Sequence, residues 1–285
     1  MTILRLRGRE FRPGEFAIMA VVNRTPDSFF DRGRTYGFAA ALEAVDGAVD
    51  GGADIVDIGG VKAGPGDEVD PAEEIRRVAD LVAAVRERHP QLIISVDTWR
   101  AEVGEVVAEA GADLLNDTWG GVDPALAEVA AKHGIGLVCA HAGRVAPRTR
   151  PHRIAYADVV ADVIGYTTDL AERAVAAGVR RESILIDPAH DFGKNTWHSL
   201  EVSRRLHEMV ATGWPVLVAV SNKDFVGETL GGLAVDERHA GTMATLAVSA
   251  WQGARVFRVH DAASARTALA TVAGLRGQGA ARDQV

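Results

Sequence analysis

One unit recurs along most of this chain: a short run rich in Val, Ile and Leu, a polar loop, an amphipathic segment rich in Ala, Glu and Arg, and then a glycine. A glycine just past a helix is a common end signal. Short apolar runs without alternation are typical of parallel strands that are buried on both faces. We expect such strands at about residues 16–23, 54–60, 92–97, 114–117, 136–141, 184–188, 215–221 and 255–260.

Eight strands separated by helices predict a closed (β/α)8 TIM barrel, because open sheets of that size are less common. An open doubly wound sheet is the alternative. Barrels of roughly 250 residues fold as one domain, so we assign residues 1–285 to a single domain. We expect a short hairpin at about residues 1–15, with Pro13-Gly14 as its turn, and a flexible tail at about residues 278–285.

Charge and cysteine content limit the partners and the compartment. A formal net charge of −8 disfavours nucleic acid and anionic membranes as partners. The single cysteine, Cys139, lies in an apolar run, so we expect neither a disulfide nor a cysteine-based metal site. The start of the chain lacks the apolar run of a signal peptide, and no stretch approaches about 18 uncharged apolar residues. We therefore expect a cytoplasmic protein.

Polar residues follow nearly every predicted strand, where a barrel of this type builds its active site. Such residues also cap helices, and Asp117 and Asp261, each just before a predicted helix, fit that structural role. Asp97, Asn116 and Asp187 are expected to converge on one cavity, where they need a donor-rich ligand or a cation. Two carboxylates and an amide carbonyl suit the N–H groups of an aminopyrimidine edge, as in a pterin.

Cationic residues would complete a pocket for a small anionic ligand. Lys223 directly follows an apolar run and can donate to a ring carbonyl or nitrogen. Arg258 and His260 lie two apart on one strand and face the same side, where an arginine can stack on a flat ring and hold phosphate. Asn23 can add a phosphate donor or a magnesium ligand. Mg²⁺ often binds through few protein oxygens plus substrate phosphates, so a dedicated cage is not required.

A series of motifs at these strand ends resembles that of the dihydropteroate synthase family. The motifs follow one another in the family's order across nearly the whole chain: Asn23-Arg24-Thr25-Pro26-Asp27-Ser28-Phe29, Asp57-Ile58-Gly59-Gly60, Ser95-Val96-Asp97-Thr98, Asn116-Asp117, Asp187-Pro188, Phe192-Gly193-Lys194, Ser221-x-Lys223 and Arg258-Val259-His260-Asp261. That family of pterin-binding barrels joins 6-hydroxymethyl-7,8-dihydropterin pyrophosphate to p-aminobenzoate with Mg²⁺, a transferase reaction of folate biosynthesis.

The resemblance implies a role for each matched residue. The pterin would be held by Asp97, Asn116, Asp187, Lys223 and Arg258. The pyrophosphate would be held by Asn23, Arg258 and His260, with Asn23 also binding magnesium. The resemblance further implies a homodimer packed through late barrel helices, for which the Ala-rich segment from Val235 to Trp251 is a candidate.

The region expected to bind the second substrate departs from the family. After Gly59-Gly60 the family continues Glu-Ser-Thr-Arg-Pro-Gly, and here the threonine and arginine positions are Ala63 and Gly64. The family's Ser-Arg-Lys-Ser becomes Ser221-Asn222-Lys223-Asp224, which places an acid where the p-aminobenzoate carboxylate should lie. Two carboxylates ~4 Å apart repel by about 4 kcal/mol at an effective dielectric near 20. Ala189-His190-Asp191 replaces Gly-Ile-Gly beside Phe192, which adds His190 and Asp191 as new polar groups.

Three functions are compatible with these residues. We favour a diverged paralogue that binds a pterin pyrophosphate-type ligand with little or no p-aminobenzoate condensing activity, and we assign no certain catalytic residue. A working dihydropteroate synthase is the first alternative. A folate-binding methyl-transfer domain is the second, and the 25–29 loop and the Arg258-x-His260 pair argue against it.

Overall fold

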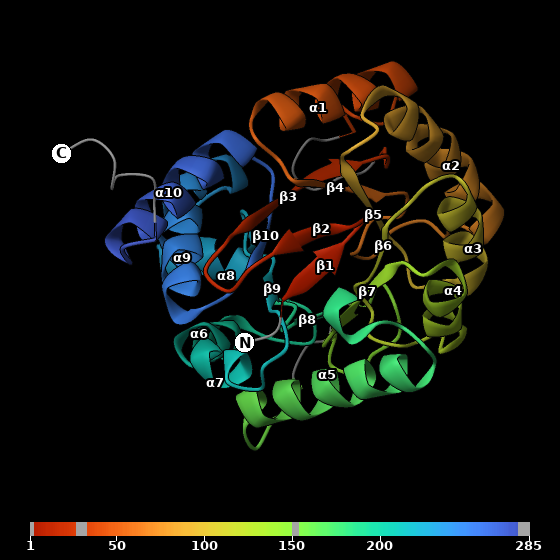
Figure 1. The fold of residues 1–285 in the computed structure, drawn as a ribbon. Helices are drawn as coiled ribbons and strands as arrows, with labels where there is room; N and C mark the ends of the chain where they lie inside the picture. The colour runs from red at the N-terminus through yellow and green to blue at the C-terminus, as the bar shows by residue number, and fades with distance from the viewer. Residues whose placement is uncertain (1–2, 27–32, 150–153, 279–285) are drawn as a thin grey trace.

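Eight parallel strands form a nearly closed barrel that is surrounded by helices in this computed structural model, which describes residues 3–26, 33–149 and 154–278 (Figure 1). The strand order is β8-β7-β6-β5-β4-β3-β10-β9. An isolated parallel bridge between Ile186 and Val216 joins the two edges of the sheet. The predicted TIM barrel is therefore confirmed, and the open sheet is excluded.

All eight predicted strands are present. They are β3 Ala17–Asn23, β4 Ile55–Gly59, β5 Ile93–Asp97, β6 Leu114–Asp117, β7 Gly136–Ala140, β8 Ile184–Asp187, β9 Leu217–Val218 and β10 Val256–Val259. β9 is shorter than expected, because pairing with β8 is limited to the bridge beside Pro215, whose carbonyl accepts the Ile186 N–H (3.0 Å). The helices are α1 Phe38–Asp50, α2 Pro71–Arg88, α3 Ala101–Glu109, α4 Ala125–His133, α5 Val159–Ala176, α6 Thr196–Arg204, α7 Leu206–Val210, α8 Asp224–Thr229, α9 His239–Gln252 and α10 Ala262–Leu275.

The N-terminal hairpin is present, but its turn is not the expected one. β1 (Leu4–Leu6) pairs antiparallel with β2 (Arg9–Phe11). Arg7 and Gly8 form the turn, with φ of 48° and 72°, and such left-handed pairs suit the twist of a two-residue hairpin. Pro13-Gly14 lies in a separate turn before β3.

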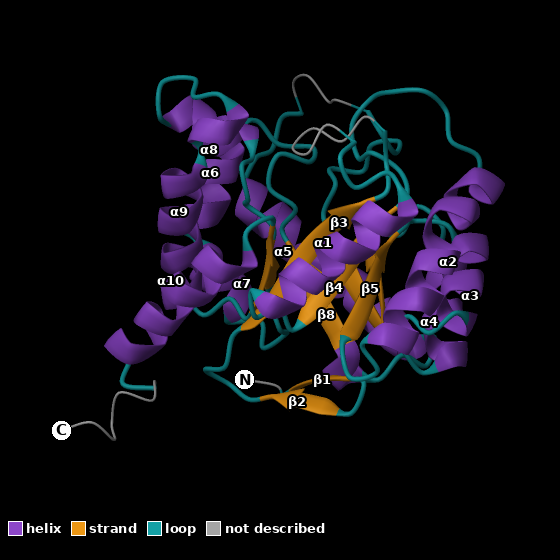
Figure 2. Cartoon of the chain, turned by 90° about the horizontal axis from the view of Figure 1, so that it is seen from above, coloured by secondary structure: helices purple, strands orange, loops and turns teal. Residues whose placement is uncertain are grey.

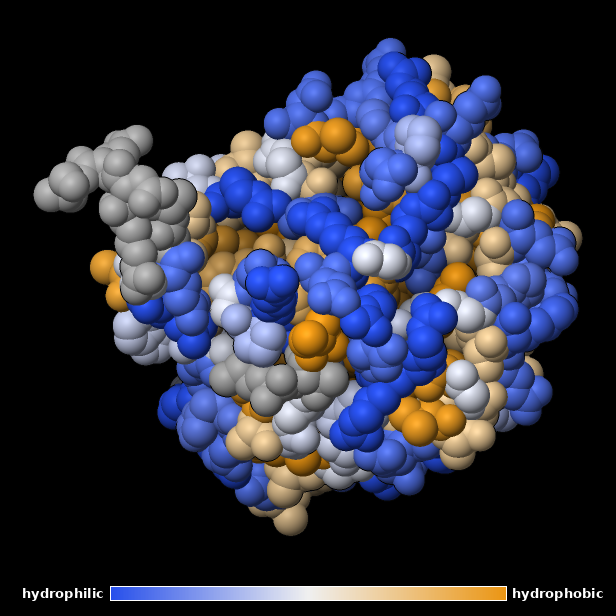
Figure 3. All heavy atoms as spheres, viewed as in Figure 1, coloured by the Kyte–Doolittle hydropathy of each residue, from blue (hydrophilic) through white to orange (hydrophobic). Residues whose placement is uncertain are grey.

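The hairpin closes one end of the barrel. It lies at the end opposite the long loops, and its apolar side chains Leu4, Leu6 and Phe11 belong to the buried cluster inside the barrel (Figure 2). Hydrophilic side chains dominate the outside of this end (Figure 3). The loops at the carboxyl ends of the strands therefore form the open end of the molecule.

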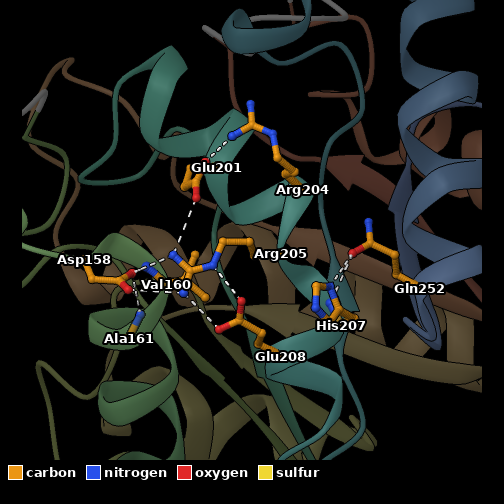
Figure 4. A network of polar contacts seen from close by, with 9 residues as sticks. All are labelled: Asp158, Val160, Ala161, Glu201, Arg204, Arg205, His207, Glu208 and Gln252. Atoms are coloured by element: carbon orange, nitrogen blue, oxygen red, sulfur yellow. Dashed lines mark hydrogen bonds and ion pairs between the residues drawn. The ribbon is translucent and has the colours of Figure 1, made fainter.

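Polar contacts join the helices on the α5–α9 side (Figure 4). Arg205, between α6 and α7, donates to both carboxylate oxygens of Asp158 (3.1 Å each) and to Glu208 (2.6 and 2.9 Å). Asp158 also caps α5, since it accepts the N–H groups of residues 160 and 161. The His207 N–H donates to Gln252 of α9 (3.1 Å), so α5, α7 and α9 are linked.

One expected helix differs in detail. The helix expected from Val235 to Trp251 is interrupted: a 3-10 turn covers Val235–Glu237, and α9 begins at His239. Arg238 separates the two, and its guanidinium donates to the carbonyls of Leu233 and Asn222. The predicted flexible tail lies outside the described residues from position 279 on. The described part of the chain contains no helix with the length and apolar character required to cross a bilayer.

Candidate ligand-binding site

The inside of the barrel changes from apolar to charged along the strands. Every strand contributes to the buried interior cluster, and the members that lie at one level are Met19, Ile55, Ile93, Leu114, Val138, Leu185, Leu217 and Val256. Side chains alternate along a strand, so the residue two positions further also points inward. Those positions are Val21, Asp57, Ser95, Asn116, Ala140, Asp187, Ala219 and Arg258. A layer with two carboxylates, an amide and a guanidinium thus lies directly above an apolar layer.

Asp57 is the centre of this layer. It is fully buried, and its Oδ2 accepts the Arg258 Nε–H (2.6 Å) and the Asn116 amide (3.1 Å). Its Oδ1 accepts the Ser95 hydroxyl (2.6 Å). A buried carboxylate with this many donors is satisfied, and it holds both Arg258 and Asn116 in fixed positions.

Asp97 is the second carboxylate on Arg258. Its Oδ2 lies 3.2 Å from Arg258 Nη2, and its Oδ1 accepts the Thr118 hydroxyl (2.9 Å). Burial raises the pKa of Asp97 to about 7, although the positive charge of Arg258 opposes the shift. The Asp97 carboxyl can accept a hydrogen bond from a ring when it is ionised and donate one when it is protonated.

Asp187 and Lys223 face each other across the cleft wall. Asp187 Oδ1 accepts the Ala189 N–H (2.7 Å), and burial raises the pKa of its carboxyl. The Lys223 ammonium donates to the His190 carbonyl and lies 4.7 Å from the centre of the Phe192 ring. The Lys223 charge thus rests between a backbone carbonyl and an aromatic face.

One cleft at this end of the barrel brings the predicted ligand residues together. Its lining includes all seven: Asn23, Asp97, Asn116, Asp187, Lys223, Arg258 and His260. Ser221 Oγ lies 2.9 Å from His260 Nδ1 and accepts the His260 backbone N–H (3.3 Å). Within the described residues, no group of three His, Cys, Asp or Glu side chains could hold a metal ion.

The model of a family described as "pterin binding enzyme" matches residues 19–260, which span the barrel from within β3 to the end of β10. The chain belongs to the pterin-binding enzyme family. It is 56% identical to "Inactive dihydropteroate synthase 2" of Mycobacterium tuberculosis over 95% of this chain and 86% of that protein. It is 54% identical to the protein of the same name in Mycobacterium leprae, over 95% and 94% of the two chains.

A solved structure of this family supports the same fold. The Yersinia pestis dihydropteroate synthase in complex with a sulfonamide drug superposes with a TM-score of 0.91 at 34% identity, covering 96% of this chain and 99% of that one. The chain is therefore a diverged relative of dihydropteroate synthase, as its strand-end motifs indicate.

The residues predicted to alter the second-substrate region lie in two places: some line the cleft, and others lie outside its lining. Ala63 and Phe192 line the cleft, together with Lys62, which the sequence reasoning did not single out. Gly64 lies outside the lining, and its carbonyl accepts from Arg148 (3.2 Å). Asp224 also lies outside the lining, with 65% of its side chain exposed, and it pairs with Arg238 (2.9 Å). This ion pair supplies Asp224 with a counter-charge that the sequence did not reveal.

His190 and Asn222 lie behind the cleft. His190 is fully buried, stacks on Phe225 with 5.3 Å between ring centres, and contacts Ser203 through Nε2 (3.0 Å). Asn222 is buried with a φ of 55°, and its N–H donates to Thr242 Oγ1 (3.0 Å). Both residues support the wall of the site rather than present a group to it.

Sequence reasoning missed the most connected residues. Asp57 appears in a matched motif, but only the inward layer shows that it anchors Arg258. Lys194 is buried, and its ammonium contacts His141 Nδ1 (2.8 Å) and the carbonyls of His141, Ala189 and Phe192 (2.8, 3.3 and 3.0 Å). The sequence did offer a signal for Lys194: it directly follows Phe192-Gly193 in a loop with few other cations.

One strand-end residue, Asp117, differs from expectation, and another, His141, lies outside the lining of the cleft. Asp117 does not cap α4: its carboxylate accepts the N–H groups of Trp119 and Gly121, which shapes the loop after β6. His141 points out of the barrel, where its Nε2 contacts Asp162 (2.7 Å). Asp261 does act as a helix cap, because it accepts the Ser264 N–H at the start of α10 (3.0 Å).

Proposed function

We propose that the cleft binds a pterin pyrophosphate-type ligand and that the chain has little or no p-aminobenzoate condensing activity. The observation that supports binding is the convergence of Asp97, Asn116, Asp187, Lys223 and Arg258 on one cleft. Acceptors on one side and cations on the other match the N–H groups and ring carbonyl of a pterin. Arg258, held by Asp57, would present its flat guanidinium to the ring.

The pyrophosphate would lie toward Asn23 and His260. Both line the main cleft and also a neighbouring hollow between α1 and α10 that includes Arg34. Magnesium fits this place, because the Asn23 amide oxygen offers one protein ligand and phosphate oxygens would complete the shell. When bound, the ion would offset the phosphate charge, while Arg258 and His260 hold the phosphate oxygens.

Weak or absent condensation is supported by the rim of the cleft. Ala63 and Gly64 cannot supply the hydroxyl and guanidinium that the family places there. Asn222 and Asp224 replace an arginine and a serine. The mycobacterial relatives at 56% and 54% identity are both named as inactive.

A working synthase is the second candidate, and one contact favours it. The Asp224 carboxylate is paired with Arg238 (2.9 Å), so a counter-charge lies beside the acid expected to repel a second carboxylate. The floor of the cleft also keeps all the residues assigned to the pterin.

Pyrophosphate release separates the candidates. The purified chain is incubated with 6-hydroxymethyl-7,8-dihydropterin pyrophosphate and Mg²⁺, with and without p-aminobenzoate, and binding of the pterin is measured by calorimetry. We expect binding without p-aminobenzoate-dependent release. Robust 7,8-dihydropteroate formation at micromolar p-aminobenzoate, or complementation of a strain that lacks the synthase, contradicts the proposal.

We also propose a homodimer that packs through α9 and α10. These neighbouring helices expose Val248, Trp251 and Leu275, which are 54%, 59% and 72% exposed. They carry few charges, in contrast to the highly charged α2. Light scattering would show a dimer, and Trp251→Glu should shift it to monomer. A cytoplasmic location is proposed from the single buried cysteine, because a thiol without a partner suits a reducing compartment.

A further inference from the structure

The wall of the cleft at residues 189–192 has an unusual backbone. Ala189 and Asp191 have φ values of 47° and 66°, on either side of His190. Non-glycine residues in this left-handed region cost about 1 kcal/mol or more each, so they persist only where contacts hold them. The wall is therefore a segment that its surroundings force into shape.

Two buried or half-buried lysines face the carbonyls of this segment. Lys194 contacts the carbonyls of Ala189 and Phe192 (3.3 and 3.0 Å), and Lys223 donates to the carbonyl of His190 between them. The whole chain contains only four lysines, Lys62, Lys132, Lys194 and Lys223. Half of the lysines in the chain thus contact this one short loop.

Asp191 ties this loop to the helix that begins beside Lys223. Its Oδ2 accepts the N–H of Phe225 in the first turn of α8 (3.2 Å). Its Oδ1 accepts the hydroxyl of Ser199 in α6 (3.1 Å), and that hydroxyl in turn accepts the Asp191 N–H (3.1 Å). The carboxylate is thus fixed from two helices, and its negative charge acts on the Lys223 ammonium.

We propose that Asp191 is a positioning residue for the cleft. Asp191 holds the first turn of α8 against residues 189–192, so that Lys223 reaches the cleft wall as a charged group. Asp191 acts through Lys223 and Phe225, since it does not line the cleft itself. It does so at a position where the resembling family carries glycine. Aspartate in place of glycine at position 191 therefore adds two side-chain hydrogen bonds and a negative charge behind Lys223.

The charges around Lys223 favour this role. Burial lowers the pKa of Lys223, and Asp191 is the strongest of the groups that raise it. The groups that act on Lys223 or lie beside it are Asp187, Asp191, Asp224, Arg258, Lys194 and the buried His190, whose pKa burial lowers. Without the Asp191 charge, Lys223 would lose its proton at lower pH.

Lysine titration by NMR tests this directly. With only four lysines, ¹³Cε-labelled lysine gives few signals, and Lys223→Arg identifies that of Lys223. In Asp191→Asn the titration midpoint of Lys223 should move to lower pH, raising its neutral fraction about tenfold at a fixed pH. Asp191→Gly also removes the charge, and glycine adopts the positive φ of this position without strain. The Lys223 midpoint should shift to lower pH in this variant too, so the shift does not depend on a distortion of the loop by asparagine. Asp236→Asn, which removes an exposed acid, should leave the midpoint unchanged.

A Lys223 midpoint that is the same in both Asp191 variants as in the wild type overturns the proposal.

A second readout rests on the proposed function. Affinity for 6-hydroxymethyl-7,8-dihydropterin is measured by calorimetry at two pH values, one below the measured Lys223 midpoints of both proteins and one between them. Asp191→Asn should bind about tenfold more weakly than wild type at the higher pH and equally at the lower pH, because one charge-assisted bond is lost only when Lys223 is neutral. Equal losses at both values would contradict a role through charge. If the wild type binds no pterin, the proposed function fails, whereas the lysine titration still decides the role of Asp191.

Discussion

The floor of the cleft and its rim hold their charges in different ways. In the floor, Asp57, Asn116 and Arg258 come from three different strands, and Asn116 and Arg258 both donate to Asp57. At the rim, Gly64 lies in a loop and its carbonyl accepts from Arg148, while Asp224 is the first residue of α8 and pairs with Arg238, just before α9. The floor has an ionic network buried on rigid strands, and the rim has a mostly exposed acid at a helix end and a loop carbonyl.

This difference explains where the chain departs from its family. A buried charge network permits few substitutions, because removing one partner leaves another charge buried without a counter-charge. An exposed pair contributes little and tolerates change. The floor therefore keeps the residues that suit a pterin, while the substitutions lie at the rim and in the cleft wall at residues 189–191.

The largest expected effect compares one acid from each region. Asp57→Asn should lower the free energy of unfolding by about 3 kcal/mol, because Arg258 loses its shortest ion pair in a buried place. Asp224→Asn should change it by less than about 0.5 kcal/mol, since that acid is mostly exposed. Urea denaturation measures both, and equal effects would break the distinction between floor and rim.

The next effect concerns ligand affinity. Asn116→Ala should weaken pterin binding by roughly 10- to 100-fold, because a ring donor and the Asp57 carboxylate both lose a partner. At the rim, Ala63→Thr should change pterin affinity by less than about twofold. Calorimetry with 6-hydroxymethyl-7,8-dihydropterin makes the comparison. A larger effect at residue 63 than at residue 116 would place the pterin at the rim.

A smaller effect appears as a pH dependence of stability. Burial raises the pKa of Asp97 to about 7 in the folded protein, compared with about 3.9 in an unfolded chain. An acid with a raised folded pKa favours the folded state at low pH, and that contribution is lost as pH rises from about 4 to 7. The wild type should therefore lose stability over this range, and Asp97→Asn should reduce the loss by about 1 kcal/mol.

Urea midpoints at pH 4.5 and pH 8 test this. Burial also raises the pKa of Asp117, to about 6, so part of the dependence should remain in the variant. An unchanged pH dependence in Asp97→Asn would show that Asp97 is ionised throughout.

The smallest effect is a gain at the rim. Asp224→Ser combined with Gly64→Arg should improve p-aminobenzoate binding a few-fold, about 0.5–1 kcal/mol, because the exposed acid is already paired with Arg238. Equilibrium dialysis with the pterin pyrophosphate present measures it. No improvement in affinity would contradict the expected repulsion between Asp224 and the p-aminobenzoate carboxylate. A hundredfold gain in affinity would mean that Arg238 does not compensate the charge of Asp224.

Much of the fold follows from sequence pattern, and parts of the site do not. The apolar runs and glycine stops place every strand, and the polar residues after them mark the open end of the barrel. Strands buried on both faces show no alternation, however, so the sequence does not reveal which side chains point inward. Asp57 and Asp117 both lie toward the end of a strand, but Asp57 joins the inward layer while Asp117 shapes a loop.

The amino-acid sequence by itself determined the barrel, the family and seven of the residues that line the cleft. The tertiary structure alone decided how charges are compensated. Arg238 reaches Asp224 from 14 positions away, and Arg258 reaches Asp57 from 201 positions away. Such pairs depend on the closure of the barrel and the path of its loops. The ionisation of a buried group depends on these neighbours in space rather than on its neighbours in sequence.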